Sequence, residues 1–187
     1  MRFVHYTTFF LISLFFTDVF SKNKNARFSI GTGIYNFMEN GKSRCKNPLI
    51  DGTCTTADLE EHKSASIAYN LEYFTKKKVL KYINPFLGFL GTTDSAYYGY
   101  FGLSGDLFFL RCKCIVITPS LAAGWYLDGE DIKLGNRIQF RSGGDITYKF
   151  KNQVRVGLGI FHISNANLGD ENPGSEQIIF KYQIPLK

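Results

Sequence analysis

Three segments near the end of the chain alternate between apolar and polar residues, and this pattern constrains the fold more than any other feature. In 137–150 the even positions include Ile138, Phe140, Ile146, Tyr148 and Phe150, whereas the odd positions include Arg137, Gln139, Arg141, Asp145 and Lys149. The segments 153–164 and 176–186 repeat the alternation. Successive side chains of a β-strand point to opposite faces, so each strand has one apolar face and one face with charges of both signs.

Eight strand-like runs rich in aromatic and β-branched residues follow one another along the chain. They cover approximately 26–38, 63–74, 78–91, 95–109, 111–126, 137–150, 153–164 and 176–186. Most exceed the usual soluble strand of about 5–6 residues and suit a tilted membrane-crossing strand of about 9–11 residues. A soluble sandwich would alternate in the same way, with its apolar face inward. Strand length, mixed charges that can pair inside a narrow lumen, and alternating short and long connections favour an all-β, eight-stranded antiparallel transmembrane barrel.

The first residues predict export. Arg2 precedes the apolar run 9–16, and the small residue Ser21 follows at a suitable cleavage point, as in a secretory signal peptide. A membrane anchor helix is the alternative, but spanning takes about 20 residues and this run is shorter. We therefore expect a signal peptide over 1–21 and an outer-membrane barrel over 22–187, in a Gram-negative cell.

Charge and cysteine content narrow the possible partners. The net charge is +6, but the Lys and Arg residues are scattered without a basic helix or nucleic-acid motif, which argues against nucleic acid. Cys45 and Cys54 flank a polar segment, which predicts a disulfide-closed loop in an oxidising compartment. Zinc is the alternative, but His62 stands alone and no ligand pair has zinc spacing, so we expect no metal. Cys112 and Cys114 share the expected strand 111–126, where a bridge would strain the backbone.

One group of residues has the composition of a catalytic site. His162 and Ser164 lie two residues apart on the apolar face of the seventh strand, and Glu176 opens the same face of the eighth. Ionisable groups facing lipid are costly and therefore suggest function. Ser can attack an ester, His can carry its proton, and a carboxylate can orient the imidazole. The alternative is that these polar residues simply mark the lipid–water interface at the strand end.

Residues 140–186 resemble the lipid A 3-O-deacylase (PagL) family of eight-stranded outer-membrane barrels. The resemblance is carried by the motif His162-x-Ser164-Asn165-Ala166, then Asn172 and Gly174, Glu176 twelve positions after the serine, and Phe140 before the histidine. It implies a catalytic triad of His162, Ser164 and Glu176, with oxyanion or substrate-positioning roles for Asn165 and Asn172, and a place for Phe140 at the site. The sequence departs from the family pattern at Asn167, where a Gly is expected, in the 45–54 loop, and at the terminal Lys187.

The resemblance implies a cofactor-free serine esterase that removes a fatty acyl chain, the 3-O-linked hydroxyacyl, from lipid A of lipopolysaccharide. With the mature N-terminus in the periplasm, the site lies at the outer ends of the last two strands. Side chains fill the lumen of an eight-stranded barrel, here including Arg137, Arg141, Asp145, Arg155 and Lys181, so the acyl chain is expected along the outer wall. The alternatives are a non-catalytic structural or adhesive barrel, and a phospholipase or acyltransferase on the same scaffold.

Overall fold

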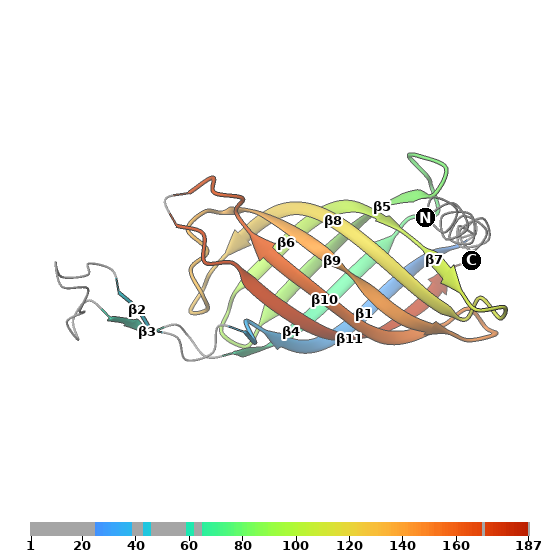
Figure 1. The fold of residues 1–187 in the computed structure, drawn as a ribbon, viewed down its shortest axis with the longest axis horizontal. Coiled ribbons are helices and arrows are strands. Elements are labelled where there is room, and N and C mark those ends of the chain that lie inside the picture. Colours follow the sequence, from blue (N-terminus) through green and yellow to red (C-terminus); the bar gives the residue numbers. More distant parts are fainter. Residues whose placement is uncertain (1–24, 39–42, 46–58, 62–64, 170, 187) are drawn as a thin grey trace, which may run out of the picture.

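The computed structural model describes residues 25–38, 43–45, 59–61, 65–169 and 171–186. Eight long strands build the main sheet: β1 (Ala26–Tyr35), β4 (Ser66–Phe74), β5 (Ile83–Thr92), β6 (Tyr97–Gly105), β8 (Ile115–Leu127), β9 (Ile138–Lys149), β10 (Arg155–Ser164) and β11 (Ser175–Leu186). Each pairs antiparallel with its neighbours, β1 pairs with β11, and β6 pairs with β8, so the sheet closes on itself (Figure 1). The predicted eight-stranded antiparallel barrel is confirmed.

Three short strands complete the described secondary structure. β7 (Leu107–Phe109) continues β6 after Asp106 and also pairs with β8, whereas β2 (Ser43–Cys45) and β3 (Leu59–Glu61) form a separate two-stranded sheet. Within the described part of the chain, no helix is long and apolar enough to cross a bilayer.

The connections fall into two sets. Segments 75–82, 110–114 and 150–154 join strands at the end of the barrel where β1 begins and β11 ends, which we call the turn end. The opposite end, the loop end, is where β1 ends and β4 begins, and it carries 93–96, 128–137 and the connection between β10 and β11. Apart from the short connection 93–96, the loop end carries the longer connections, and such an asymmetry between the two ends is typical of outer-membrane barrels.

Two strands begin four or five residues later than their sequence pattern predicts. β5 begins at Ile83, because 75–82 forms a connection, and β8 begins at Ile115. Cys112 and Cys114 form a disulfide in the turn that precedes β8, so the bridge lies outside the strand that it was expected to strain. The predicted Cys45–Cys54 bridge and the predicted signal peptide lie outside the residues whose side chains are described, and both stay predictions.

The alternation of the sequence becomes the two faces of the wall. Ile160 and Phe180 are exposed on the outside, whereas Arg141 and Lys181 are fully buried in the lumen. The lumen assignment of Arg137 is wrong. This residue precedes the first residue of β9, is exposed, and places its guanidinium carbon 5.9 Å from the centre of the Trp125 ring.

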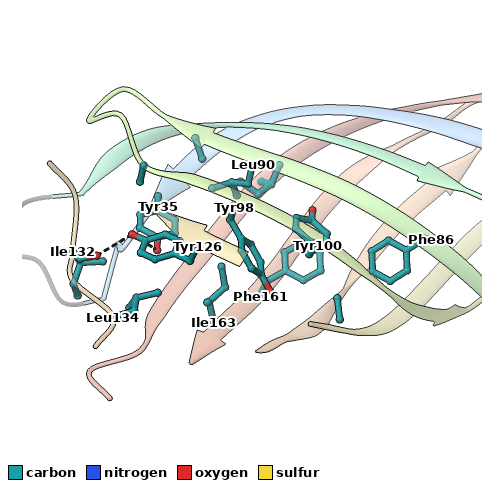
Figure 2. Packing of buried hydrophobic residues seen from close by; sticks show 14 of the residues in the cluster. Tyr35, Phe86, Leu90, Tyr98, Tyr100, Tyr126, Ile132, Leu134, Phe161 and Ile163 are labelled. Atoms are coloured by element: carbon teal, nitrogen blue, oxygen red, sulfur yellow. Dashed lines mark hydrogen bonds between the residues drawn. The ribbon is translucent and has the colours of Figure 1, made fainter. Parts of the chain in front are cut away.

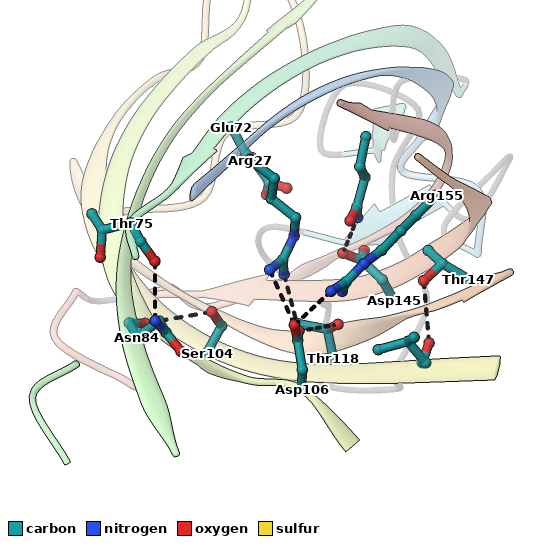
Figure 3. A network of polar contacts seen from close by, with 12 residues as sticks. Arg27, Glu72, Thr75, Asn84, Ser104, Asp106, Thr118, Asp145, Thr147 and Arg155 are labelled. Atoms are coloured by element: carbon teal, nitrogen blue, oxygen red, sulfur yellow. Dashed lines mark hydrogen bonds and ion pairs between the residues drawn. The ribbon is translucent and has the colours of Figure 1, made fainter. Parts of the chain in front are cut away.

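Charged groups in the lumen are paired. Glu72 accepts hydrogen bonds from Lys181 (2.6 Å), Arg141 (3.2 Å) and the Tyr100 hydroxyl (2.8 Å). Nearer the turn end, the carboxylate of Asp106 accepts bonds from Arg27, Arg155 and Thr118 (Figure 3). Buried charge is tolerated only when it is paired in this way. The lumen therefore holds networks of ion pairs in its middle and toward the turn end.

The loop 128–137 covers the mouth of the lumen at the loop end. Ile132 and Leu134 are buried beside aromatic residues of the lumen (Figure 2). The Tyr126 hydroxyl donates to the Ile132 carbonyl at 2.9 Å, and Asp131 accepts bonds from hydroxyl groups of β4 and β5 at 2.6 and 2.9 Å. Both the middle and the mouth of the barrel are thus occupied by protein.

Candidate active site

His162 and Glu176 meet on the outside of the barrel. They are cross-strand partners on β10 and β11, and both side chains point away from the lumen. His162 Nδ1 lies 3.0 Å from Glu176 Oε1, and the side chains are 46% and 26% exposed. An ionised carboxylate only accepts hydrogen bonds, so a neutral His162 donates from Nδ1 and keeps the lone pair on Nε2. That tautomer suits a general base.

Gly174 sits directly against the imidazole of His162. Its φ of +72° is in the left-handed region, and a Cβ there would lie 2.7 Å from His162 Cε1. Only glycine combines this backbone conformation with this closeness at low cost. The end of the loop before β11 therefore packs directly against the ring.

Ser164 is the last residue of β10 and shares the outer face with His162. It is partly exposed, and its cross-strand partner on β9 is Phe140. Between these described residues there is no hydrogen bond from Ser164 Oγ to His162. Nucleophile–base bonds are often long in ligand-free enzymes and tighten when substrate binds. The pairing of β10 with β9 and β11 brings four of the predicted site residues together on the wall: His162, Ser164, Glu176 and Phe140.

Asn165 and Asn172 hold the loop 165–174 in shape. Asn165 is fully buried, and its Nδ2 donates to the carbonyls of Leu134 at 2.8 Å and Glu171 at 2.6 Å. The backbone N–H of Asn165 donates to Asn172 Oδ1 at 3.0 Å. Both amide hydrogens of Asn165 are thus bonded to backbone carbonyls, so this side chain holds the loop and does not face the outer wall.

A tight turn follows the serine. The N–H of Leu168 donates to the carbonyl of Asn165 at 3.0 Å, and both central residues have positive φ, 52° at Ala166 and 61° at Asn167. These features define a type I′ turn. Asn adopts left-handed backbone more readily than most residues, so Asn167 takes the conformation that glycine would take there. The N–H groups of Ala166 and Asn167 donate to no acceptor among the described residues.

The loop 128–137 supports the site from behind, and the sequence did not reveal this. A Cβ on Gly135 would lie 2.2 Å from the Glu171 carbonyl, and one on Gly169 would lie 2.5 Å from the Gly135 carbonyl. Asn136 Nδ2 also donates to the carbonyl of Leu168 at 3.1 Å. The adjacent glycine and asparagine at 135–136 signal a turn but give no hint of its partner.

An apolar hollow of about 740 Å³ lies on the outer wall beside the site. Its lining begins at Phe140, the neighbour of Ser164, and crosses β8 and β6 through Ala123, Leu121 and Leu103. It ends near the turn end of the barrel at Tyr82 and Leu107. The hollow therefore runs down the wall from the neighbourhood of Ser164 toward the turn end.

Among the described residues, no three His, Cys, Asp or Glu side chains are grouped to hold a metal ion. The arrangement offers a hydroxyl, an imidazole and a carboxylate on one face, near an apolar hollow and two backbone N–H groups that have no acceptor among the described residues. Those are the groups needed for acyl transfer from an ester.

Comparison with known proteins gives one family match and several structural ones. The family model described as lipid A 3-O-deacylase (PagL) matches residues 63–185. The crystal structure of the outer membrane enzyme PagL is similar with a TM-score of 0.59 and 18% identity, over 86% of this chain and 99% of that one. A de novo designed transmembrane β-barrel is similar with a TM-score of 0.50 and 9% identity, over 89% and 98%. No curated protein matches.

Proposed function

We propose that this chain, which belongs to the lipid A 3-O-deacylase (PagL) family, hydrolyses the 3-O-linked hydroxyacyl ester of lipid A through Ser164, His162 and Glu176. The observation that carries the proposal is the 3.0 Å contact between His162 and Glu176 on the outer face of the barrel, two residues from Ser164. Membership of the family and the barrel fold place the protein in the outer membrane, where lipid A is the substrate at hand.

The proposed reaction has two halves. Ser164 Oγ attacks the ester carbonyl while His162 Nε2 takes its proton, and the sugar oxygen leaves with that proton as the carbonyl re-forms. Water then attacks the acyl–serine ester with the same assistance, releasing the fatty acid and restoring Ser164. Throughout, Glu176 stabilises the imidazolium and fixes the ring. No cofactor is required.

The turn after Ser164 supplies the proposed oxyanion donors. The N–H groups of Ala166 and Asn167 have no acceptor among the described residues and lie two and three residues beyond Ser164, and we propose that they donate to the carbonyl oxygen as it gains negative charge. Asn165 and Asn172 are proposed to position this turn. Replacing Asn165 with Ala should therefore lower activity and make the 165–174 loop easier to cleave by protease. Activity loss with an unchanged loop would instead favour direct contact with substrate.

The proposed acyl path is the hollow beyond Phe140. The lumen is filled with side chains, buried ion pairs among them, and Ile132 and Leu134 cover its mouth, whereas the hollow is apolar and lies on the outer face of the wall. A lipid A molecule could then reach Ser164 by lateral diffusion without leaving the membrane. We propose that the barrel comprises residues 22–187 and is exported by a signal peptide at 1–21.

The test is mass spectrometry of lipid A after incubation with refolded protein. Loss of one hydroxyacyl group from the 3-position, located by fragmentation, is expected with the wild type. Ser164→Ala and His162→Ala should abolish the loss, and Glu176→Gln should reduce it less, because Glu176 does not touch substrate. All three should keep heat-modifiable gel migration, since these side chains lie outside the lumen. Gain of acyl mass would indicate transfer, and an unchanged spectrum with wild type would refute hydrolysis.

A further inference from the structure

The turn end of the barrel is strongly cationic. Its connections carry Lys76, Lys77, Lys78, Lys81, Arg111, Lys113 and Lys151, and no Asp or Glu occurs in 75–82, 110–114 or 150–154. Asp106, the acidic residue next to this end, is buried in the lumen and already binds Arg27 and Arg155. No acidic residue of these connections therefore compensates the positive charge. The charge faces the leaflet opposite to the one that holds lipid A.

The connection 75–82 combines this charge with exposed apolar residues. Val79 and Leu80 are 63% and 62% exposed at its tip, between Lys78 and Lys81. In Figure 1 the green segment before β5 rises away from the barrel instead of continuing along its axis. Apolar residues flanked by lysines at the edge of a transmembrane wall suit the headgroup region, where the apolar groups enter lipid and the ammonium groups stay hydrated.

Two of these lysines converge on the end of the wall hollow. Lys78 Nζ and Lys81 Nζ lie 5.9 and 5.2 Å from the centre of the Tyr82 ring, and Lys78 Nζ also donates to the Lys81 carbonyl at 3.2 Å. Tyr82 lines the hollow together with Leu107 and Leu103. Two cations thus lie beside the turn-end part of the apolar hollow on the outer wall, far from Ser164.

We propose that Lys78, Lys81 and Tyr82 bind the phosphodiester of an anionic glycerophospholipid, with one acyl chain in the turn-end part of the hollow. The two lysine ammonium groups favour an anionic headgroup. Because Tyr82 also lines the apolar hollow, an acyl chain of the same lipid can lie in the hollow. The site takes its lipid from the leaflet opposite to lipid A. It is independent of ester hydrolysis at the loop end.

The test uses the full-length barrel in uncharged detergent, with native mass spectrometry to count bound phosphatidylglycerol or phosphatidylcholine of equal chain length. We expect the wild type to retain phosphatidylglycerol preferentially. Lys78→Gln with Lys81→Gln should weaken that binding about tenfold to thirtyfold, since each lysine near an anionic headgroup contributes about 1 kcal/mol. Lys81→Gln alone should weaken it about fivefold, which guards against disturbance of the loop by loss of the Lys78 bond.

Lys76→Gln with Lys77→Gln is the matched control, because it removes the same charge from the same connection without touching Tyr82. Its effect should be clearly smaller. Equal loss in both double variants would overturn the site in favour of diffuse attraction. Equal retention of the two lipids by the wild type would also overturn it. Displacement of the lipid by glycerophosphoglycerol, which lacks acyl chains, as effectively as by phosphatidylglycerol would refute the role of the hollow.

Discussion

Replacement of Gly174 by Ala should disable the site while leaving the barrel folded. The new Cβ would lie 2.7 Å from His162 Cε1 and 3.4 Å from Nε2. Carbon atoms in contact prefer about 3.5–4.0 Å, so the two must separate by about 1 Å. The imidazole is the end of a side chain that is 46% exposed, so it should move more readily than the backbone.

Movement of the ring has a larger effect on catalysis than on stability. It would lengthen the 3.0 Å contact with Glu176 and turn Nε2 away from Ser164. A misplacement of about 1 Å can cost about 100-fold in rate. Left-handed backbone costs an alanine about 1–2 kcal/mol, which a closed barrel should tolerate.

The assay is release of hydroxyacyl chains from lipid A, with initial rates measured over a range of substrate concentrations. The loss should appear in kcat, because the hollow that binds the chain is unchanged. Gly99→Ala is the control, since a Cβ there meets no atom within 4 Å. A Gly174→Ala enzyme that folds and turns over at the wild-type rate would refute the packing argument, and equal loss in both variants would show that it is not specific.

Three other predictions address the wall, the lumen and the covalent structure. Ala123→Trp should fill the hollow and slow turnover of long-chain lipid A more than that of a short soluble ester, whereas Leu158→Trp, outside the hollow, should affect neither. If Ala123→Trp changed the turnover of both substrates to the same extent, the proposed acyl path would be contradicted. Glu72→Ala should lower the free energy of unfolding in guanidinium by about 3–5 kcal/mol, because it leaves buried cations without their carboxylate, and an unchanged midpoint would contradict this. Peptide mass mapping with and without reductant should find Cys45 joined to Cys54, and free thiols at both positions would exclude the bridge.

The alternation along each strand made the barrel predictable from sequence. It separated Ile160 and Phe180 on the outside from Arg141 and Lys181 inside, and the structure places all four as expected. The prediction failed for Arg137, because β9 begins at Ile138. A side chain that precedes the strand need not follow the inward and outward alternation of the strand residues. It failed similarly for Cys112 and Cys114, which lie in a turn that the apolar pattern of their neighbours concealed.

The same alternation put His162, Ser164 and Glu176 on one face, since the face of each residue is set by the local backbone. The direct pairing of His162 with Glu176 depends instead on the register between β10 and β11, and the ring's position depends on Gly174. The support of the site by 128–137, the covered mouth and the wall hollow arise from segments distant in sequence. Tertiary structure alone decided these features, because loop contacts and surface shape depend on how separate segments pack in space, which local periodicity does not record.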